Sequence, residues 1–256
     1  MNQLWAELSL YFPAFLGYFK DMNSNVMLRV LKIIANPAVF QDSTEEEFLT
    51  LLADVGRISV NRKRELFTHL STYTVHIASP GVAARAVRAR ILADQILAMN
   101  TSIKAVDELV DDLFQKHSQA AIFQSLPGAG ERLAPRLLAF IGDNKERFDS
   151  YQRLQCYAGT CPLTEQSGKW LNRVKMRRAC NKGMRHALHL FSFTSLRSEK
   201  WAREYYDLMK SRGKSHNAAI RALANKWAKI IYRMWKDGRP YNSEIFLKKR
   251  ETCATA

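Results

Sequence analysis

A serine followed by a dense basic segment is the part of the sequence best equipped for chemistry. Ser167 lies in Glu165-Gln166-Ser167-Gly168, directly before residues 169–185, which contain seven Lys or Arg and no Asp or Glu. A serine hydroxyl can attack carbon or phosphorus when it is activated and when cations stabilise the developing charge. No general base is obvious nearby, which disfavours a hydrolase triad and favours phosphoryl chemistry on DNA. On residue chemistry alone, however, a Ser-Gly pair in a loop is most often a simple turn.

The net positive charge of the chain lies entirely in its second half. Residues 1–124 hold 12 Lys or Arg and 13 Asp or Glu, whereas residues 125–256 hold 27 and 11, within a total net charge of +15. A solvated face usually mixes both signs, so this asymmetry indicates a polyanionic partner, nucleic acid ahead of an anionic membrane. A merely soluble basic protein is the alternative.

Length and composition exclude several protein classes. The chain has 256 residues, of which 47% are hydrophobic, enough for a real core and too many for wholesale disorder. No window approaches 18 uncharged apolar residues, and the N-terminus lacks the features of a signal peptide. We therefore expect a soluble, cytoplasmic protein with no membrane partner. Its four irregularly spaced cysteines do not predict a disulfide framework.

Metal and nucleotide motifs are missing from the sequence. There is no Walker loop, no G-x-G-x-x-G after a strand and no H-E-x-x-H. His186 and His189 could share a helix face, but no third ligand is apparent, and Cys156 and Cys161 have no matching second pair. The sequence therefore predicts no metal site.

Most of the chain has the apolar period of helices, which predicts a mainly α fold. Residues 26–35 read as a buried helix that stops at Asn36-Pro37, and residues 42–44 form an N-cap region before three glutamates. Residues 143–168 are rich in turn formers. Further helices are expected at 184–196, 199–211 and 216–236.

A long helix is expected over residues 82–118, and it carries a heptad pattern. The apolar positions at alternating steps of four and three are Leu92, Ile96, Met99, Ile103, Val106, Val110 and Leu113. Three heptads are the lower limit for a coiled coil, so an intramolecular helical hairpin and a dimer seam are about equally favoured.

A Pro-Gly turn interrupts the helical pattern at residues 126–130, before helix resumes at 132–141. The sequence Leu126-Pro127-Gly128-Ala129-Gly130 resembles the turn of a helix-hairpin-helix element. In that element glycines let backbone amides approach a DNA phosphate, which makes Gly128 and Gly130 candidate contacts. A purely structural connection between two helices is an equally good interpretation.

The run SLPGAGERLAPRLLAFIGDNKERFDSYQRLQCYAGTCPLTEQSGKW resembles the C-terminal region of the DEDD-type insertion-sequence transposases, the IS one-ten and Piv-like family. The likeness is strong over residues 125–242 and weaker upstream. Later segments follow the family's order, namely residues 181–188, 202–206, 212–214, 218–228 and 237–241.

The resemblance implies a role for Ser167. In these proteins, which look like serine recombinases, the serine of a Q-S-G motif attacks DNA and forms a transient phosphoserine, and Ser167 occupies that place. Relatives are guided by a structured RNA, so RNA is an implied partner beside DNA. Basic residues that could hold phosphates near this serine are Lys169, Arg173, Lys175, Arg177, Arg178, Lys182 and Arg185.

One feature of the family has no counterpart in the sequence. Full-length relatives begin with a RuvC-like domain whose four acids bind magnesium, and nothing here resembles it. The resemblance thus implies a truncated or split product that binds no cofactor itself, with Mg²⁺ expected only if a RuvC-like domain is supplied. Three regions are expected: 1–124, a helical linker and coiled-coil region; 125–245, a mostly helical, helix-hairpin-helix-like transposase domain; and 246–256, a tail.

The function favoured by the sequence is therefore DNA transposition or site-specific recombination of an insertion sequence with a serine nucleophile. The alternative is a non-catalytic nucleic-acid-binding remnant, or a regulator of a full-length transposase. A hydrolase that uses Ser167 comes third. Expected partners are DNA, a structured guide RNA and further protein chains, in a homo-oligomer or a mixed oligomer with the full-length transposase.

Overall fold

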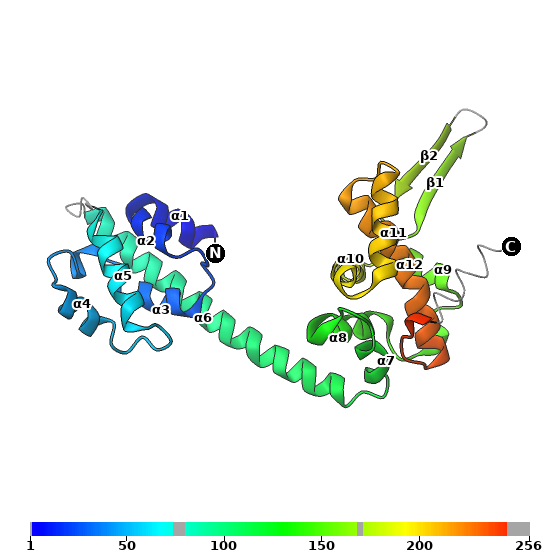
Figure 1. Cartoon of the computed structure of the whole chain (residues 1–256), viewed down its shortest axis with the longest axis horizontal. Coiled ribbons are helices and arrows are strands. Elements are labelled where there is room, and N and C mark those ends of the chain that lie inside the picture. Colours follow the sequence, from blue (N-terminus) through cyan, green and yellow to red (C-terminus); the bar gives the residue numbers. More distant parts are fainter. Residues whose placement is uncertain (1, 74–79, 168–170, 245–256) are drawn as a thin grey trace. The chain divides into compact units, whose positions relative to one another are not determined.

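The computed structural model describes residues 2–73, 80–167 and 171–244. Within these ranges the protein is mainly α-helical with one antiparallel pair of strands, which confirms the predicted fold class (Figure 1). The helices are α1 (Asn2–Tyr11), α2 (Pro13–Tyr18), α3 (Asn25–Ile34), α4 (Glu45–Leu51), α5 (Val60–Ser71), α6 (Pro80–Gln115), α7 (Ala120–Gln124), α8 (Gly130–Ile141), α9 (Tyr151–Tyr157), α10 (Lys182–Ser198), α11 (Lys200–Ser211) and α12 (His216–Asp237). The strands are β1 (Pro162–Ser167) and β2 (Leu171–Met176).

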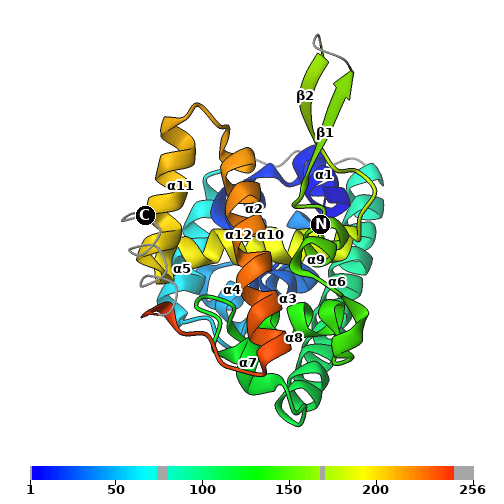
Figure 2. The same ribbon diagram turned by 90° about the vertical axis from the view of Figure 1, so that its right-hand side faces the viewer.

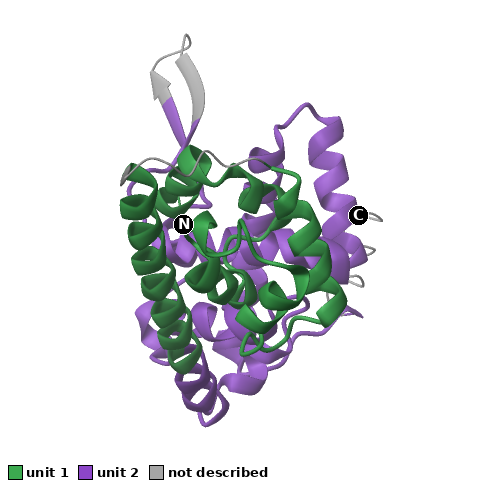
Figure 3. Ribbon diagram, turned by 90° about the vertical axis from the view of Figure 1, so that its left-hand side faces the viewer, with its two compact units in different colours: residues 1–106 green, residues 107–256 purple. Residues whose placement is uncertain are grey.

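The chain divides into two compact units, residues 1–106 and residues 107–256 (Figure 3). The division falls inside α6, between Val106 and Asp107. The boundary expected at residue 125 marks a change in composition, whereas this division marks a change in packing partners.

Local signals explain the helices of the first unit. α3 begins at Asn25 and ends before Asn36-Pro37, as the sequence predicts, and it buries Met27, Leu31 and Ile34. At α4 the hydroxyl of Thr44 accepts from the backbone N–H of Glu47, and the carboxylate of Glu47 accepts from the backbone N–H of Thr44. This capping box satisfies two backbone donors that a helix start leaves unpaired.

The heptad positions of α6 have two different environments. Leu92 and Ile96 pack against the core of the first unit. The later positions are Met99, Ile103, Val106, Val110 and Leu113, whose exposed fractions lie between 42% and 61%. Within the described part of the chain, no second helix covers these five residues, and the choice between a hairpin and a dimer seam stays a prediction.

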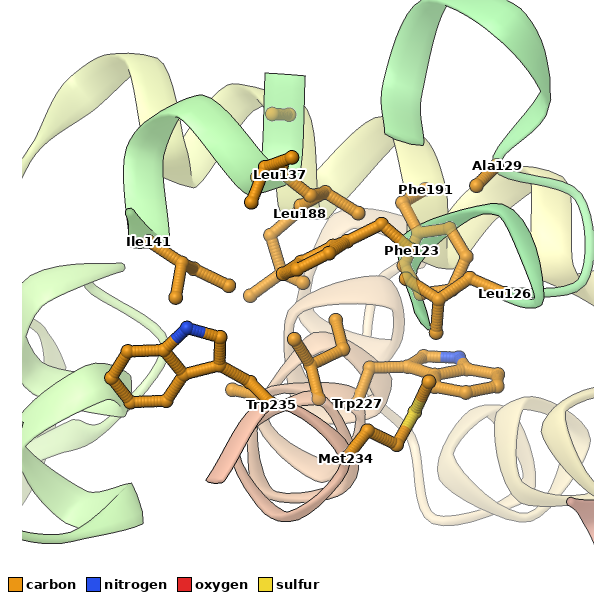
Figure 4. Packing of buried hydrophobic residues seen from close by; sticks show 14 of the residues in the cluster. Phe123, Leu126, Ala129, Leu137, Ile141, Leu188, Phe191, Trp227, Met234 and Trp235 are labelled. Atoms are coloured by element: carbon orange, nitrogen blue, oxygen red, sulfur yellow. The ribbon is translucent and has the colours of Figure 1, made fainter. Parts of the chain in front are cut away.

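Large side chains from three helices pack together in the core of the second unit. Leu137 and Ile141 of α8, Leu188 and Phe191 of α10, and Trp227 and Trp235 of α12 pack together (Figure 4). The indole N–H of Trp227 donates to the hydroxyl of Ser195 at 2.9 Å, so the polar atom of this large buried side chain is satisfied. The core gives α10 and α12 fixed positions from which surface side chains can act.

A β-hairpin replaces part of the region that the sequence predicts as turns. Glu165, Gln166 and Ser167 lie in β1 instead of a flexible turn. The hairpin was missed because a pair of six-residue strands carries few β-branched residues and packs too little apolar surface to leave a strong pattern.

Candidate nucleic-acid interface

The β-hairpin carries Ser167 away from the helices of the second unit. The strands pair antiparallel, with Pro162 opposite Met176 at the helical end and Ser167 opposite Leu171 at the far end. Figures 1 and 2 show both strands projecting beyond the helices. Five residues along β1 separate Pro162 from Ser167, a length of about 17 Å at 3.4 Å per residue. The hairpin thus holds Ser167 at a distance from the core.

Two candidate phosphate ligands lie on β2 and a third outside the described residues. Arg173 is opposite Glu165, and Lys175 is opposite Leu163. The ammonium of Lys175 is 2.6 Å from a carboxylate oxygen of Glu165. Residues 169–185 contain no acidic residue, but strand pairing brings the carboxylate of Glu165 next to Lys175. Lys169 falls outside the described residues.

Arg185 is engaged with the main chain at the base of the hairpin. Its guanidinium Nη2 donates to the carbonyls of Arg177 and Arg178 and contacts Cys180 Sγ. A side-chain carbon on Gly159 would lie 2.7 Å from both that nitrogen and the Cys180 sulfur, and Gly159 has φ +66°. Arg185 therefore holds the segment between β2 and α10 in place, a role that the sequence did not reveal.

Asn181 joins the same segment to α9. Its side-chain oxygen accepts from the backbone N–H of Met184 and caps α10, while its side-chain nitrogen donates to the hydroxyl of Tyr157 at 2.9 Å. Its backbone N–H donates to the carbonyl of Tyr157 at 2.8 Å. The end of α9 and the start of α10 thus form one base for the hairpin.

Four of the candidate cations gather near the start of α10. Arg178 and Lys182 are exposed, and neither has an acidic partner among the described residues. Arg177 and Arg185 are half-buried, and the Nε atom of each is buried with no hydrogen-bond partner in the described ranges. This concentration of positive charge beside a hairpin suits a phosphate backbone.

The two candidate glycines differ in what surrounds them. Gly128 has φ +80°, and a side-chain carbon there would lie 3.1 Å from Ser198 Oγ and 3.2 Å from the backbone of Thr194. Gly128 therefore allows the turn to approach α10. Gly130, the first residue of α8, has φ +56° and open space within 4 Å. Of the two, only Gly130 leaves room for an approaching phosphate.

Cys180 lies next to Gly159, and Cys156 lies next to Cys161. Burial, followed by the neighbouring Cys156 thiol, raises the pKa of Cys161, while Arg177 lowers it. Among the described residues no group of three or more His, Cys, Asp or Glu is placed to hold a metal ion. Cys253 falls outside the described ranges.

A third histidine, His216 of α12, lies near His186 and His189 of α10, and the sequence did not reveal it because it is far from them along the chain. Burial, followed by the charges of His216, His186 and Arg221, lowers the pKa of His189. His216 also contacts the Tyr206 hydroxyl, at 2.7 Å. The spacing of His186 and His189 predicts that they share a helix face, whereas His216 joins them only through the packing of α12.

Comparison with known proteins places the basic region within a transposase family. Residues 120–207 match the family described as Transposase IS116/IS110/IS902 family. None of the helices in the described ranges is long and apolar enough to cross a membrane.

Similar proteins include products of insertion elements and a DNA-inverting protein. The 42 kDa protein of insertion element IS900 from Mycobacterium paratuberculosis is 30% identical over 167 residues, 65% of this chain and 42% of that protein. The 43.6 kDa protein of insertion element IS110 from Streptomyces coelicolor is 29% identical over 217 residues, 84% of this chain and 53% of that protein. The pilin gene-inverting protein of Moraxella lacunata is 27% identical over 158 residues, 59% of this chain and 49% of that protein. The chain thus spans about half the length of the curated relatives it matches.

Proposed function

Because this chain belongs to the IS116/IS110/IS902 transposase family, we propose that it acts in DNA transposition or site-specific recombination, with Ser167 as the nucleophile. The observation that carries the proposal is the family match over residues 120–207, which includes Ser167 and the basic segment after it. The relative named for inverting a pilin gene supports a recombination reaction, since inversion also breaks and rejoins DNA.

The proposed chemistry is a transfer of a DNA phosphodiester to serine and back. The Ser167 hydroxyl loses its proton as its oxygen bonds to phosphorus, the bond from phosphorus to one DNA oxygen breaks, and that oxygen takes up a proton. Attack by a DNA hydroxyl on the phosphoserine then releases the serine. Cations near the phosphate stabilise the charge of each transition state.

The exposed cations at the base of the hairpin support this role. Arg178 and Lys182 can bind backbone phosphates directly, whereas Arg185 positions the segment that carries them. Lys175 can do so by exchanging Glu165 for a phosphate. A structured guide RNA is a further proposed partner, with the same phosphate chemistry.

Magnesium has no place in the steps assigned to this chain. The described residues include no cluster of carboxylates, histidines or cysteines able to hold a metal ion, so they do not fit the magnesium site of a RuvC-like domain.

Self-association is proposed for the exposed face of α6. Met99, Ile103, Val106, Val110 and Leu113 are apolar, repeat at heptad spacing and are exposed. A stripe of this kind is buried when it packs against a second helix, and a second copy of the same stripe provides a self-complementary surface.

The test traps the covalent intermediate. The chain, alone and joined to a RuvC-like domain from a relative, is incubated with element-end DNA and structured RNA, then denatured. A protein–DNA adduct is expected that disappears with Ser167→Ala and persists with Ser211→Ala, an exposed serine on α11. An adduct that survives Ser167→Ala refutes the nucleophile, and the lack of any adduct favours a non-catalytic DNA-binding role.

A further inference from the structure

Three histidines and an arginine from two helices meet on the surface of the second unit. His186 and His189 lie three residues apart on α10, and His216 begins α12. Arg221 follows on α12, next to the end of β2. The charged neighbours that act on His189 are His186, His216 and Arg221, all of them basic. The cluster therefore groups four basic side chains, and no carboxylate acts on its central residue.

Aromatic side chains accompany these cations. Phe193, seven residues after His186 on α10, is 44% exposed, and its ring is edge-on to His216 with centroids 6.0 Å apart. The hydroxyl of Tyr206, on α11, lies 2.7 Å from His216 Nδ1. Flat apolar rings beside hydrogen-bonding cations are typical of surfaces that bind nucleic acid, where the cations take phosphates and the rings contact sugars or bases.

The cluster adjoins the base of the hairpin that carries Ser167. Arg221 Nη1 lies 3.1 Å from Met176 Sδ, and Met176 is the last residue of β2. Met176 pairs with Pro162, five residues from Ser167 on β1. The corresponding length of about 17 Å equals roughly five nucleotides of one DNA strand at 3.4 Å each. A DNA strand alongside the hairpin can therefore contact both places at once.

We propose that His186, His189 and His216, with Arg221, form a proton-linked binding site for the DNA backbone, about five nucleotides from the phosphate at Ser167. This site deepens the proposed function and rests on it. Phosphate oxygens supply the negative charge that the cluster lacks. DNA binding then favours protonated imidazoles, so it is coupled to the uptake of protons.

The groups around His189 set the direction of this coupling. In the free chain, burial and three basic neighbours disfavour its protonation. Tyr206 of α11 is a hydroxyl neighbour of His216, and Met176 of β2 is uncharged, so neither element adds an opposing charge through these contacts. A bound phosphate reverses the balance and raises the pKa of His189.

Fluorescence anisotropy of the full chain with a 30-base-pair DNA duplex tests the site at pH 8 and pH 6. We expect the wild type to bind about tenfold more tightly at pH 6, the effect of an average uptake of about half a proton over these two pH units. The triple variant His186→Gln, His189→Gln, His216→Gln should change less than twofold between the two pH values. The matched control His117→Gln, a histidine of the same unit outside the cluster, should keep the wild-type difference.

A second measurement keeps the test valid if the triple variant is destabilised. NMR titration of the wild-type imidazoles should show the pKa of His189 rising on addition of DNA. The proposal is overturned if the triple variant retains the full pH dependence while folded, or if the pKa of His189 does not move when DNA binds. A pH effect seen with structured RNA and not with DNA overturns the assignment to DNA. No DNA binding by the wild type at either pH refutes the proposed function as well.

Discussion

The guanidinium of Arg185 donates to the main-chain carbonyl of Arg177 eight residues earlier in the chain. This bond closes the segment that runs from the end of β2 to the first turn of α10. Gly159 lies against it with no side chain to obstruct the guanidinium. One of the seven cations of the basic segment is therefore a structural support for the others.

Replacement of Arg185 by Lys should destabilise the second unit. The guanidinium bonds both carbonyls through Nη2, and the ammonium of a lysine does not end at that position, so at least one of the two carbonyls loses its partner. We expect a loss of about 1–3 kcal/mol in the free energy of unfolding, measured by urea denaturation. The exposed Arg178→Lys is the control and should change stability by less than about 0.5 kcal/mol. Equal effects of the two substitutions would contradict a structural role for Arg185.

Gly159→Ala should lower the free energy of unfolding more than Gly213→Ala, although both glycines have positive φ. Gly159 has φ +66° and its new methyl group would lie 2.7 Å from two atoms, whereas Gly213 has φ +77° and open space. Backbone strain alone predicts a loss of about 1–2 kcal/mol for Gly213→Ala. Gly159→Ala adds about 1–3 kcal/mol from overpacking. Comparison of the two denaturation midpoints checks the difference, and similar midpoints would argue against close packing at Gly159.

DNA binding should lose salt sensitivity when exposed cations near α10 are removed. Each phosphate contact releases condensed counterions, so Arg178→Gln with Lys182→Gln should reduce the slope of log affinity against log salt by about two. The control Lys20→Gln, an exposed lysine of the first unit, should leave the slope unchanged. An unchanged slope in the double variant would exclude both residues from phosphate contact.

Stability of the free chain should fall as the pH is lowered through the titration range of His189. Its pKa is lowered in the folded chain below the ordinary value of about 6.5, chiefly by burial. The folded chain therefore binds fewer protons than the unfolded chain, and its stability is complete above about pH 7 and declines below about pH 6.5. Between pH 7.5 and pH 5.5 the melting temperature should fall less for His189→Gln than for the wild type. A loss of the same size in both would show that other groups control the acid sensitivity.

Self-association through α6 should be lost when a charge is placed on its exposed apolar stripe. Ile103 is 49% exposed at the middle of the stripe, so Ile103→Lys can be made without unfolding the chain, and a lysine there cannot pack against a second copy. Sedimentation velocity should show a shift from dimer or larger species to monomer. Lys104→Arg, the next residue along the helix, should keep the oligomeric state. The dimer proposal is wrong if folded Ile103→Lys sediments as the wild type does.

Much of the helical structure could be predicted from the sequence because its determinants are local. The capping box of Thr44 and Glu47 and the stop at Asn36-Pro37 lie within a few residues of the helix ends that they define. Ser167 and the basic segment were likewise found as neighbours in sequence. The likeness to a transposase family was readable for the same reason, since its motifs are short and ordered along the chain.

Tertiary structure alone decided what surrounds those motifs. The hairpin forms only when two short strands pair, which brings Glu165 to Lys175 and neutralises part of a segment that is acid-free in sequence. Packing of α10 against α12 brings His216 to His186 and His189, and the same unit anchors Arg185 to main-chain carbonyls. A sequence pattern records the side chains that a segment requires, but not which distant segment completes their charges and hydrogen bonds. Those partners are determined by which apolar faces pack together.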